Sequence, residues 1–409
     1  NMLVKNNYVS NSCMTLNDGG GIDIDDADGM QVLDNVIVNS FGNVESSYSP
    51  ISYANGIYFA SSVTKNVLIK GNTIANNGYV GINVDNKATS VNNQIINNVL
   101  YNNAYSQIVM TDYSSTSYTP SYSNIVKGNL MYCLSFLQTC MEHQMFKSPT
   151  FSDFGTFDSN YYCNPYTEHI MRRSMVYGTY NTKYYTLSSW KDLFNEDLTS
   201  GTSSFVFDQY RVLDTLSSNM ILNSRFATDL TNWSTTPSAG STIVHNINPM
   251  LDTGCMKIRW NGSGGPQGLT SCNYLTLTKN NYYFLSFDYA GDYKGDLSVF
   301  GRPNAGASPF LFARRYLAVE NFRKKQSFVF KPDTTETQAR VTFSMVLPDT
   351  TAYVDNAYLY RVNVERIDST IKNRLFYNPT NSVQVYSLNG IPYKSPDGTP
   401  VSGSIVLQP

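Results

Sequence analysis

An asparagine recurs at a fixed place in a repeated strand pattern, and this repeat constrains the fold more than any other feature of the chain. In each copy an apolar stretch precedes the Asn and a second short apolar stretch follows it. Asn supplies 23 of the first 129 residues, which is more than ordinary loops explain. The equivalent residues are 28, 37, 26 and 31 positions apart, and they are Asn7, Asn35, Asn72, Asn98 and Asn129.

Each interval of the repeat holds a second short strand, and Gly directly precedes three of the four. Strands this short, with a turn residue at a fixed phase, are typical of a solenoid in which each coil pairs only with its neighbours. Asn tolerates left-handed backbone, and its amide can bond to the Asn of the next coil. We therefore predict an all-β protein that begins as a right-handed parallel β-helix with the five Asn residues in one column. A β-sandwich with Asn-rich turns does not explain the fixed phase.

The pattern changes twice along the chain. It loosens after Met131, where Leu187–Phe194 has the character of a capping segment. Near Asn219 it gives way to strands of period 2, which predict an antiparallel jelly-roll sandwich. The predicted divisions are a β-helix over 1–215, a β-sandwich over 216–365 and a short C-terminal β segment over 366–409. Because the chain begins in mid-repeat, we expect further coils to precede it.

Composition excludes several classes of protein. Charged residues make up 15% and aromatic residues 13%, which is unlike a disordered or coiled-coil chain. The net charge of −2 provides no general basic face for nucleic acid. No apolar run approaches the 18 residues of a membrane span. Six Cys with no C-x-x-C pair and three His argue against zinc. Cys255 and Cys272 fit either a disulfide or two buried thiols.

The densest acidic cluster lies between residues 18 and 29. Strand alternation places Asp23 and Asp25 outward on one face, ~6.8 Å apart. Asp85 holds the place of Asp25 two coils further on, at ~9.6 Å. Both distances lie near the range of an acid and a base that flank a water in inverting glycosidases, and neighbouring like charges raise the pKa of a general acid. We assign Asp23, Asp25 and Asp85 as candidate catalytic residues.

Two other interpretations of this cluster remain open. Asp26 and Asp28, followed by Gly29, form half of an Asp-rich calcium loop and predict a structural Ca²⁺ site. Alternatively, the cluster is a solvated turn on the polar side of the β-helix and carries no chemistry.

Basic residues separate the possible enzyme classes. No Arg precedes Arg172, and the first 129 residues hold nine acids and five Lys, a net charge of −4. A lyase that acts on uronic acids needs a Lys, Arg, His or Tyr base, and cations to neutralise the substrate carboxylate. The sequence therefore favours hydrolysis of a neutral glycan. Tyr58 and Tyr113 keep a calcium-assisted lyase open.

Aromatic residues of the sandwich are candidate sugar contacts. Aromatic faces bind the C–H side of a pyranose ring, while polar side chains bond its hydroxyls. Trp260 precedes a Gly-rich stretch, and Tyr289 and Tyr293 follow in the next strand region. We assign these three residues to carbohydrate binding. Trp233 has the pattern of a core residue.

Three phrases of the first half carry a resemblance to a known class of proteins. They resemble right-handed parallel β-helix repeat proteins, of the pectate-lyase-like superfamily, that bacteria of the Bacteroidetes type secrete. The last 40 residues are similar to the β end-piece of such polysaccharide-acting proteins. The phrases are Asp18-Gly-Gly-Gly-Ile22, Gly155-Thr-Phe-Asp-Ser-Asn-Tyr-Tyr-Cys-Asn-Pro165 and Thr186-Leu-Ser-Ser-Trp-Lys191.

The second half is similar to jelly-roll carbohydrate-binding modules of the family 4/9 type. Such modules begin with an Asn and Trp phrase, here Asn223 and Trp233, and end with a Val-Asp-Asn-Ala phrase, here Val354 to Ala357. The resemblance implies a structural calcium at Asp355.

Together these features predict a secreted or cell-surface protein whose partner is a polysaccharide or oligosaccharide. We predict a glycoside hydrolase with paired carboxylates on the β-helix, an appended glycan-binding module and no organic cofactor. The alternatives are a non-catalytic glycan-binding surface protein or adhesin, and a calcium-assisted polysaccharide lyase.

Overall fold

The chain forms two compact units, Asn1–Phe207 with Ser369–Pro409, and Asp208–Asp368. Strands dominate both units, so the all-β prediction is confirmed. In the described part of the chain, no helix is long and apolar enough to cross a membrane. The computed structural model describes residues 2–46, 51–60, 63–85, 90–112, 121–146, 154–175, 181–236, 240–252, 254–261, 269–291, 295–304, 310–345 and 350–408.

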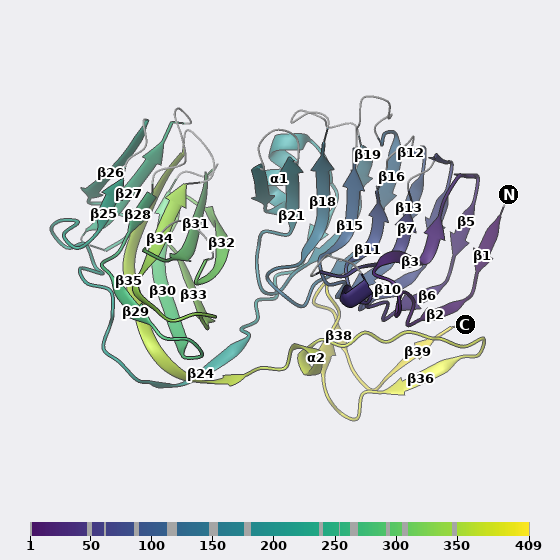
Figure 1. Ribbon diagram of the computed structural model, residues 1–409. Helices are drawn as coiled ribbons and strands as arrows, with labels where there is room; N and C mark the ends of the chain where they lie inside the picture. The colour runs from purple at the N-terminus through teal and green to yellow at the C-terminus, as the bar shows by residue number, and fades with distance from the viewer. Residues whose placement is uncertain are drawn as a thin grey trace. The chain divides into compact units, whose positions relative to one another are not determined.

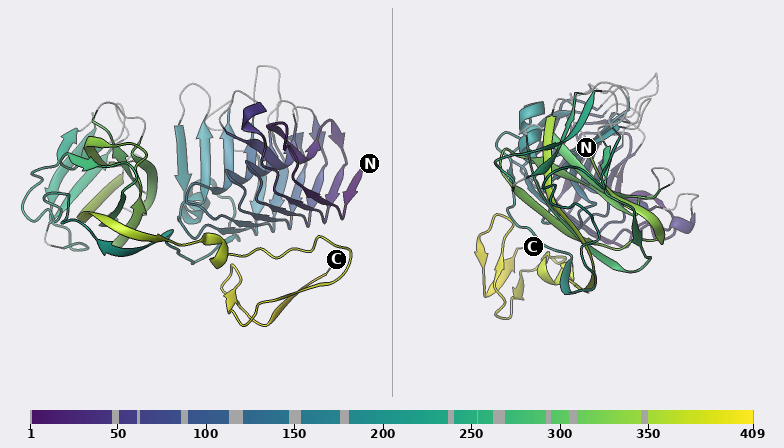
Figure 2. Two further views of the ribbon diagram at one scale, coloured as in Figure 1. Left: turned by 60° about the horizontal axis from the view of Figure 1, so that its bottom comes forward. Right: turned by 90° about the vertical axis from the view of Figure 1, so that its left-hand side faces the viewer.

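The first unit is a parallel β-helix, in which each full coil gives one strand to each of three sheets (Figures 1 and 2). Sheet A contains β1 (Leu3–Lys5), β5 (Gln31–Leu33), β9 (Leu68–Lys70), β13 (Gln94–Ile96), β16 (Asn124–Lys127) and β19 (Gly155–Asp158). Sheet B contains β2 (Tyr8–Ser10), β6 (Val36–Val38), β10 (Thr73–Ala75), β14 (Val99–Tyr101), β17 (Leu130–Tyr132), β20 (Tyr161–Cys163) and β23 (Gly201–Thr202). Sheet C contains β3 (Asp18–Ile24), β7 (Tyr53–Phe59), β11 (Val80–Val84), β15 (Ser106–Thr111), β18 (Thr139–Met145), β21 (Met171–Met175) and β22 (Asn181–Tyr185).

Apolar side chains of successive coils stack in register inside the β-helix. Burial of a side chain of this size contributes about 1.5–3 kcal/mol, so the stack holds the coils together. The smaller elements are η1 (Val44–Ser46) and a three-stranded sheet of β4 (Ala27–Asp28), β8 (Thr64–Lys65) and β12 (Ser90–Val91). The buried stack of sheet C consists of Ile22, Ile57, Ile82, Ile108, Met141 and Met171.

Glycine precedes three of these isoleucines because the backbone of sheet C lies against neighbouring side chains there. A Cβ on Gly56 would lie 2.3 Å from Cγ2 of Ile74, and a Cβ on Gly81 would lie 2.8 Å from Cδ2 of Leu100. Both distances are shorter than real Cβ contacts, so a larger residue would push sheets B and C apart.

The predicted asparagine column is confirmed, and it stands at the corner between sheets A and B. Each side-chain amide donates to the Oδ1 of the Asn one coil further on, at 2.9–3.0 Å. Asn160 extends the column at 3.0 Å, and its amide donates to Asp197 at 3.1 Å. Neither residue was predicted. The confirmed members are Asn7, Asn35, Asn72, Asn98 and Asn129.

The left-handed backbone at this corner belongs to the residue before each ladder asparagine. These residues have φ between 53° and 71°, which places the following Asn side chain inside the coil. The position therefore takes glycine or small polar residues, which tolerate this conformation. They are Asn6, Asp34, Gly71, Asn97, Gly128 and Ser159.

The last coil of the β-helix is covered by α1 (Leu187–Phe194) and by β22, which pairs antiparallel with β21. Thr186 accepts a hydrogen bond from the backbone N–H of Ser189 and so caps the helix N-terminus. Trp190 is fully buried in the β-helix core. The segment therefore ends the hydrophobic core, as predicted.

The C-terminal segment, residues 369–409, belongs to the β-helix unit. The hydroxyl of Tyr101 donates to the backbone oxygen of Asn373 at 2.8 Å, and the hydroxyl of Tyr161 donates to that of Pro396 at 2.9 Å. Its elements are α2 (Ser369–Lys372), β36 (Gln384–Ser387), β37 (Tyr393–Lys394), β38 (Pro400–Val401) and β39 (Ser404–Leu407).

The second unit is an antiparallel β-sandwich around one core. Sheet E contains β26 (Ser241–Asn246), β27 (Cys255–Trp260), β35 (Thr350–Arg366), β30 (Tyr282–Gly291) and β33 (Lys324–Phe330), and β24 (Tyr210–Thr215) also pairs with β35. Sheet F contains β25 (Ser234–Thr236), β28 (Leu269–Ser271), β34 (Glu336–Met345), β31 (Gly295–Arg302) and β32 (Phe312–Val319), and β29 (Leu275–Leu277) also pairs with β34.

Two predicted boundaries are corrected. Residues 210–215, which we predicted to end the β-helix, form β24 and pair with β35 of the sandwich. Residues 365–366 belong to β35, and the segment that follows packs on the β-helix instead of forming a separate piece. In both cases a pairing between residues some 150 positions apart decides the division. Cys255 and Cys272 are buried free thiols, so the disulfide alternative is not formed.

Candidate functional site

The outer face of sheet C gathers acidic and polar side chains of neighbouring coils. Asp23 of β3 is in register with Tyr58 of β7, and Tyr58 is in register with Asn83 of β11. The residues on either side of Asp23, Ile22 and Ile24, are buried, so Asp23 points away from the core. Sequence and register together therefore place one polar side chain from each of three coils in a row.

Tyr58 links this row to Asp85. Its hydroxyl donates to Oδ2 of Asp85 at 3.0 Å. Burial raises the pKa of Tyr58 well above its ordinary value, and the charges of Asp85 and Asp18 raise it further. Tyr58 therefore remains a proton donor to Asp85, which is unsuited to the role of a lyase base. Tyr113, the other candidate lyase base, lies outside the described residues.

Asp23 has the environment of a general acid. Partial burial raises the pKa of its carboxyl, the backbone N–H of Gly20 lowers it, and the charges of Asp18 and Asp25 raise it again. A carboxyl with a raised pKa stays protonated closer to neutral pH, which is the state that a general acid needs. The Asp18 carboxylate was not among the predicted site residues.

Asp25 lies just after β3 and is exposed. Ile24, Phe59 and Val84 are in register, so Asp25 and Asp85 hold equivalent positions two coils apart. Two strand spacings separate these positions by ~9.6 Å. The structure thus brings Asp23, Asp25 and Asp85 to one face, while their catalytic role stays a prediction.

Further along the same face, Glu142 of β18 forms a buried ion pair with Arg172 of β21. Ser174 also donates to Glu142, at 2.6 Å, and the Arg172 guanidinium lies 4.3 Å from the centroid of the Tyr105 ring. Tyr105 in turn stacks on Tyr79 at 4.8 Å. The positive charge that sheet C places on this face at Arg172 is therefore already neutralised. Sequence reasoning missed this pair because the loops between the strands vary in length.

Asp26 and Asp28, the predicted calcium-loop residues, are exposed on the turn after β3. Asp28 accepts a hydrogen bond from the side-chain amide of Asn66 at 2.7 Å. Asp26 has a left-handed backbone with φ of 47°. Among the described residues, no group of three or more His, Cys, Asp or Glu is arranged to hold a metal ion. Calcium at this turn stays a prediction without geometric support.

The predicted sugar contacts of the sandwich have different surroundings. Tyr289 is 1% exposed in the sandwich core, so its assignment to carbohydrate binding is wrong. A register shift between Ser286 and Asp288 resets the alternation of β30 and turns Tyr289 inward. Trp260 is half-buried and packs against the core. Tyr293 lies outside the described residues.

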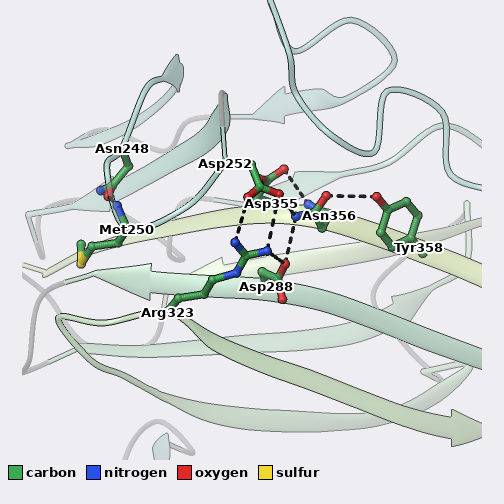
Figure 3. Close-up of polar contacts among 8 residues, drawn as sticks. All are labelled: Asn248, Met250, Asp252, Asp288, Arg323, Asp355, Asn356 and Tyr358. Atoms are coloured by element: carbon green, nitrogen blue, oxygen red, sulfur yellow. Dashed lines mark hydrogen bonds and ion pairs between the residues drawn. The ribbon is translucent and has the colours of Figure 1, made fainter.

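Asp355 lies in a cluster of polar side chains on sheet E (Figure 3). Asn356 donates through its amide to Asp252 at 2.7 Å and to Asp288 at 2.9 Å. The guanidinium of Arg323 bridges the same two carboxylates. Burial raises the pKa of Asp355 to about 6, and the charges of Asp252 and Asp288 add to the effect.

The donors of this cluster do not fit a calcium ion in their present arrangement. Calcium takes six to eight oxygen ligands. Here the Arg323 guanidinium lies between Asp252 and Asp288 and supplies the positive charge that an ion would bring. The cluster is also absent from the groups of described residues that could hold a metal. We therefore assign Arg323 as the cation of this cluster.

Replacing Asp355 with Asn should stabilise the sandwich at pH 7.5. The folded carboxyl titrates near 6 and the unfolded one near 3.9, so the folded state holds the extra proton between these values. Stability from this group is thus present below pH 4 and lost as pH rises through 6, by at most about 3 kcal/mol. Calorimetric melting at pH 5 and 7.5 should show a smaller pH effect in the variant.

Exposed Asp214 of β24 provides the matched control, because Asp214→Asn should leave melting unchanged at both pH values. A bound calcium ion predicts the opposite result for Asp355→Asn. The variant would then melt lower at pH 7.5, and added Ca²⁺ would raise the melting temperature of the unaltered protein only.

Comparison with known proteins gives structural similarities but no family. No protein-family model and no curated protein sequence matches the chain. The enzymatically active domain of tailspike protein 4 from bacteriophage CBA120 is similar at 10% identity, covering 87% of this chain and 60% of that one, with a TM-score of 0.30.

Carbohydrate-binding modules are similar over a smaller part of the chain. One is the N-terminal cellulose-binding domain of β-1,4-glucanase C from Cellulomonas fimi, at 12% identity, with 37% of this chain and 99% of that one covered and a TM-score of 0.28. Another is a xylan-binding domain from Paenibacillus barcinonensis, at 11% identity, with 37% and 96% covered and a TM-score of 0.27. Similarities this weak carry no argument, and the fold assignment rests on the strand registers above.

Proposed function

We propose that the protein binds a polysaccharide on the outer face of sheet C and hydrolyses it, with Asp23 as general acid and Asp85 as general base. The observation that carries the proposal is the arrangement of two carboxylates on either side of Tyr58, one with a raised pKa and the other hydrogen-bonded. This arrangement gives the two acids different environments, which is how one pair of carboxyls takes two roles.

In the proposed reaction Asp23 gives its proton to the glycosidic oxygen as the bond to the leaving sugar breaks. Asp85 takes a proton from a water that attacks the anomeric carbon from the opposite side. The Tyr58 hydroxyl holds Asp85 in position. Two coils separate Asp23 from Asp85, ~9.6 Å across the strands, which suits an inverting enzyme with a water between the carboxyls better than the ~5–5.5 Å of a retaining one.

The charges of this face favour a neutral substrate. Asp18, Asp23, Asp25 and Asp85 gather on it, and Arg172 is paired with Glu142. An acidic polysaccharide would be repelled by the unpaired carboxylates. We further propose that the protein acts outside the cell, like the secreted β-helix proteins that its sequence resembles.

Hydrolysis of a neutral polysaccharide should depend strongly on the two carboxylates. Xylan, β-glucan, galactan, mannan and arabinan are the substrates to assay by release of reducing sugar. Asp23→Asn and Asp85→Asn should each lower the rate about 100-fold, the scale expected for loss of a general acid or base. Tyr58→Phe should lower kcat about tenfold, because Asp85 loses its positioning hydrogen bond.

Asp34→Asn is the matched control, since Asp34 is an exposed carboxylate at the A–B corner whose 3.8 Å contact with Lys5 contributes little. Full activity of Asp23→Asn would overturn the assignment of the acid. Binding of a glycan with no release of reducing sugar would instead assign a non-catalytic glycan-binding protein. Activity that needs Ca²⁺ and yields unsaturated products would assign a lyase.

A further inference from the structure

The outer face of sheet F carries three arginines on neighbouring strands. We propose that this face binds an acidic saccharide through its carboxylate or sulfate groups. The inference rests on the proposed function only in taking the ligand to be a glycan. It concerns a different unit from the catalytic face, and a different charge.

Strand alternation places Arg340, Thr342 and Ser344 of β34 on this face, because the residues between them are buried in the sandwich core. Arg302 of β31 is the direct register partner of Arg340. Like charges directly opposite each other in a sheet repel and destabilise it. An anion held between the two guanidinium groups would remove that repulsion.

Arg314 of β32 adds a third guanidinium to this face. It lies 4.3 Å from the centroid of the Phe300 ring, and Phe300 is in register with Thr342. The ring of Phe310 lies on it as well, at 5.4 Å. The aromatic rings hold the guanidinium by cation–π attraction, which orders the group without neutralising its charge.

Two of these guanidinium groups have an unused donor. Nε of Arg314 and Nε of Arg340 are both buried and have no hydrogen-bond partner among the described atoms. Arg340 bonds through Nη2 to the backbone oxygen of Asn304, at a long 3.5 Å, and its charge lies 5.4 Å from the Tyr274 ring. A buried N–H of a charged group without an acceptor is costly, and a carboxylate or sulfate oxygen is the acceptor that a guanidinium binds best.

Carboxylates of the protein do not take this role. Of the ion pairs between described residues, none includes Arg314 or Arg340. On the outward side of β34, Glu336 stands four residues from Arg340, ~13.6 Å along the strand. Its Oε1 accepts from the backbone N–H of Gln338 at 2.8 Å.

Hydroxyl groups beside the arginines favour a sugar as the anion carrier. Ser271 and Thr342 join their hydroxyls at 2.8 Å, and Ser298 is in register with Ser344. Hydroxyls in a row can exchange hydrogen bonds with those of a sugar ring while arginine holds its acid group. A single-stranded nucleic acid needs free aromatic faces for its bases, and the Phe300 face is covered by Arg314.

Affinity electrophoresis of the full chain tests the proposal. Gels that contain polygalacturonate or dextran sulfate should retard the protein, whereas gels with neutral dextran should not. Arg314→Gln and Arg340→Gln should each weaken retardation about tenfold, as expected for loss of one charge-assisted hydrogen bond. Arg259→Gln, an exposed arginine on β27 of the other sheet, is the matched control and should bind normally. Equal melting temperatures would establish that the variants fold.

Three results would overturn the proposal. They are equal retardation by neutral dextran, retardation that survives the double variant Arg314→Gln with Arg340→Gln, and complete competition by single-stranded DNA at the same charge concentration. Hydrolysis of a neutral glycan is measured separately. Loss of that activity in Asp23→Asn with normal polygalacturonate retardation supports both inferences, whereas intact activity in Asp23→Asn overturns only the catalytic one.

Discussion

Replacing Trp190 with Ala should lower the free energy of unfolding of the β-helix unit by about 3–5 kcal/mol. The side chain is fully buried at the last coil, and its ring lies against those of His143, Tyr185 and Phe194 at centroid distances of 4.9, 5.7 and 4.7 Å. Truncation would leave a cavity among these rings. It would also weaken the cap that covers the end of the core, and a solenoid needs such a cap to stay closed.

Leu193→Ala on the same helix is the matched control. Leu193 is 56% exposed, so its truncation removes little buried surface and Ala favours the helix. Urea unfolding followed by hydrogen exchange at the strands of β18 and β21 would locate the loss at the C-terminal coils. An equal effect of both substitutions would mean that α1 acts only as a surface helix.

Replacing Asn72 with Leu should lower the free energy of unfolding by about 3 kcal/mol or more. Asn72 is fully buried and accepts hydrogen bonds from both the backbone and the amide of Asn35. Its own amide donates to Asn98 at 2.9 Å and to the backbone oxygen of Val32 at 2.9 Å. Each buried partner left without a hydrogen bond costs about 1–3 kcal/mol, and the substitution strands several at once.

Asn7→Leu provides the comparison within the same column. Asn7 is exposed at its end and donates to Asn35, but no coil before it in the described chain donates to it. Its replacement should cost less than about 1 kcal/mol. Equal losses at positions 7 and 72, measured by chemical denaturation, would show that the column is not a cooperative ladder.

The asparagine column could be predicted because local residues fix it. An apolar pair before each Asn turns inward, and a small polar or Gly residue with left-handed backbone sets the corner, so the phase is written in consecutive residues. Asn160 has the same phase but is followed by Tyr161 and Tyr162 in place of aliphatic residues, which hid it.

The polar pairs of the site depend on registers that the sequence does not display. Glu142 and Arg172 meet because β18 and β21 are paired 30 residues apart, whereas β15 and β18 are paired 33 apart. Asp23 and Asp85 were found because their coils keep a similar Ile-x-Ile or Ile-x-Val strand. Tyr289 was misassigned because a single register shift reverses the alternation on which the prediction relied.

The return of residues 369–409 to the β-helix has a consequence for how the protein is synthesised and folds. Tyr101 and Asn373 are 272 positions apart, so their hydrogen bond cannot form until the sandwich has left the ribosome. The cost of closing so long a loop grows only slowly with its length, and a sandwich that has already folded shortens the flexible part. The first coils must therefore remain without these contacts during most of translation, and the last residues made complete the first domain begun.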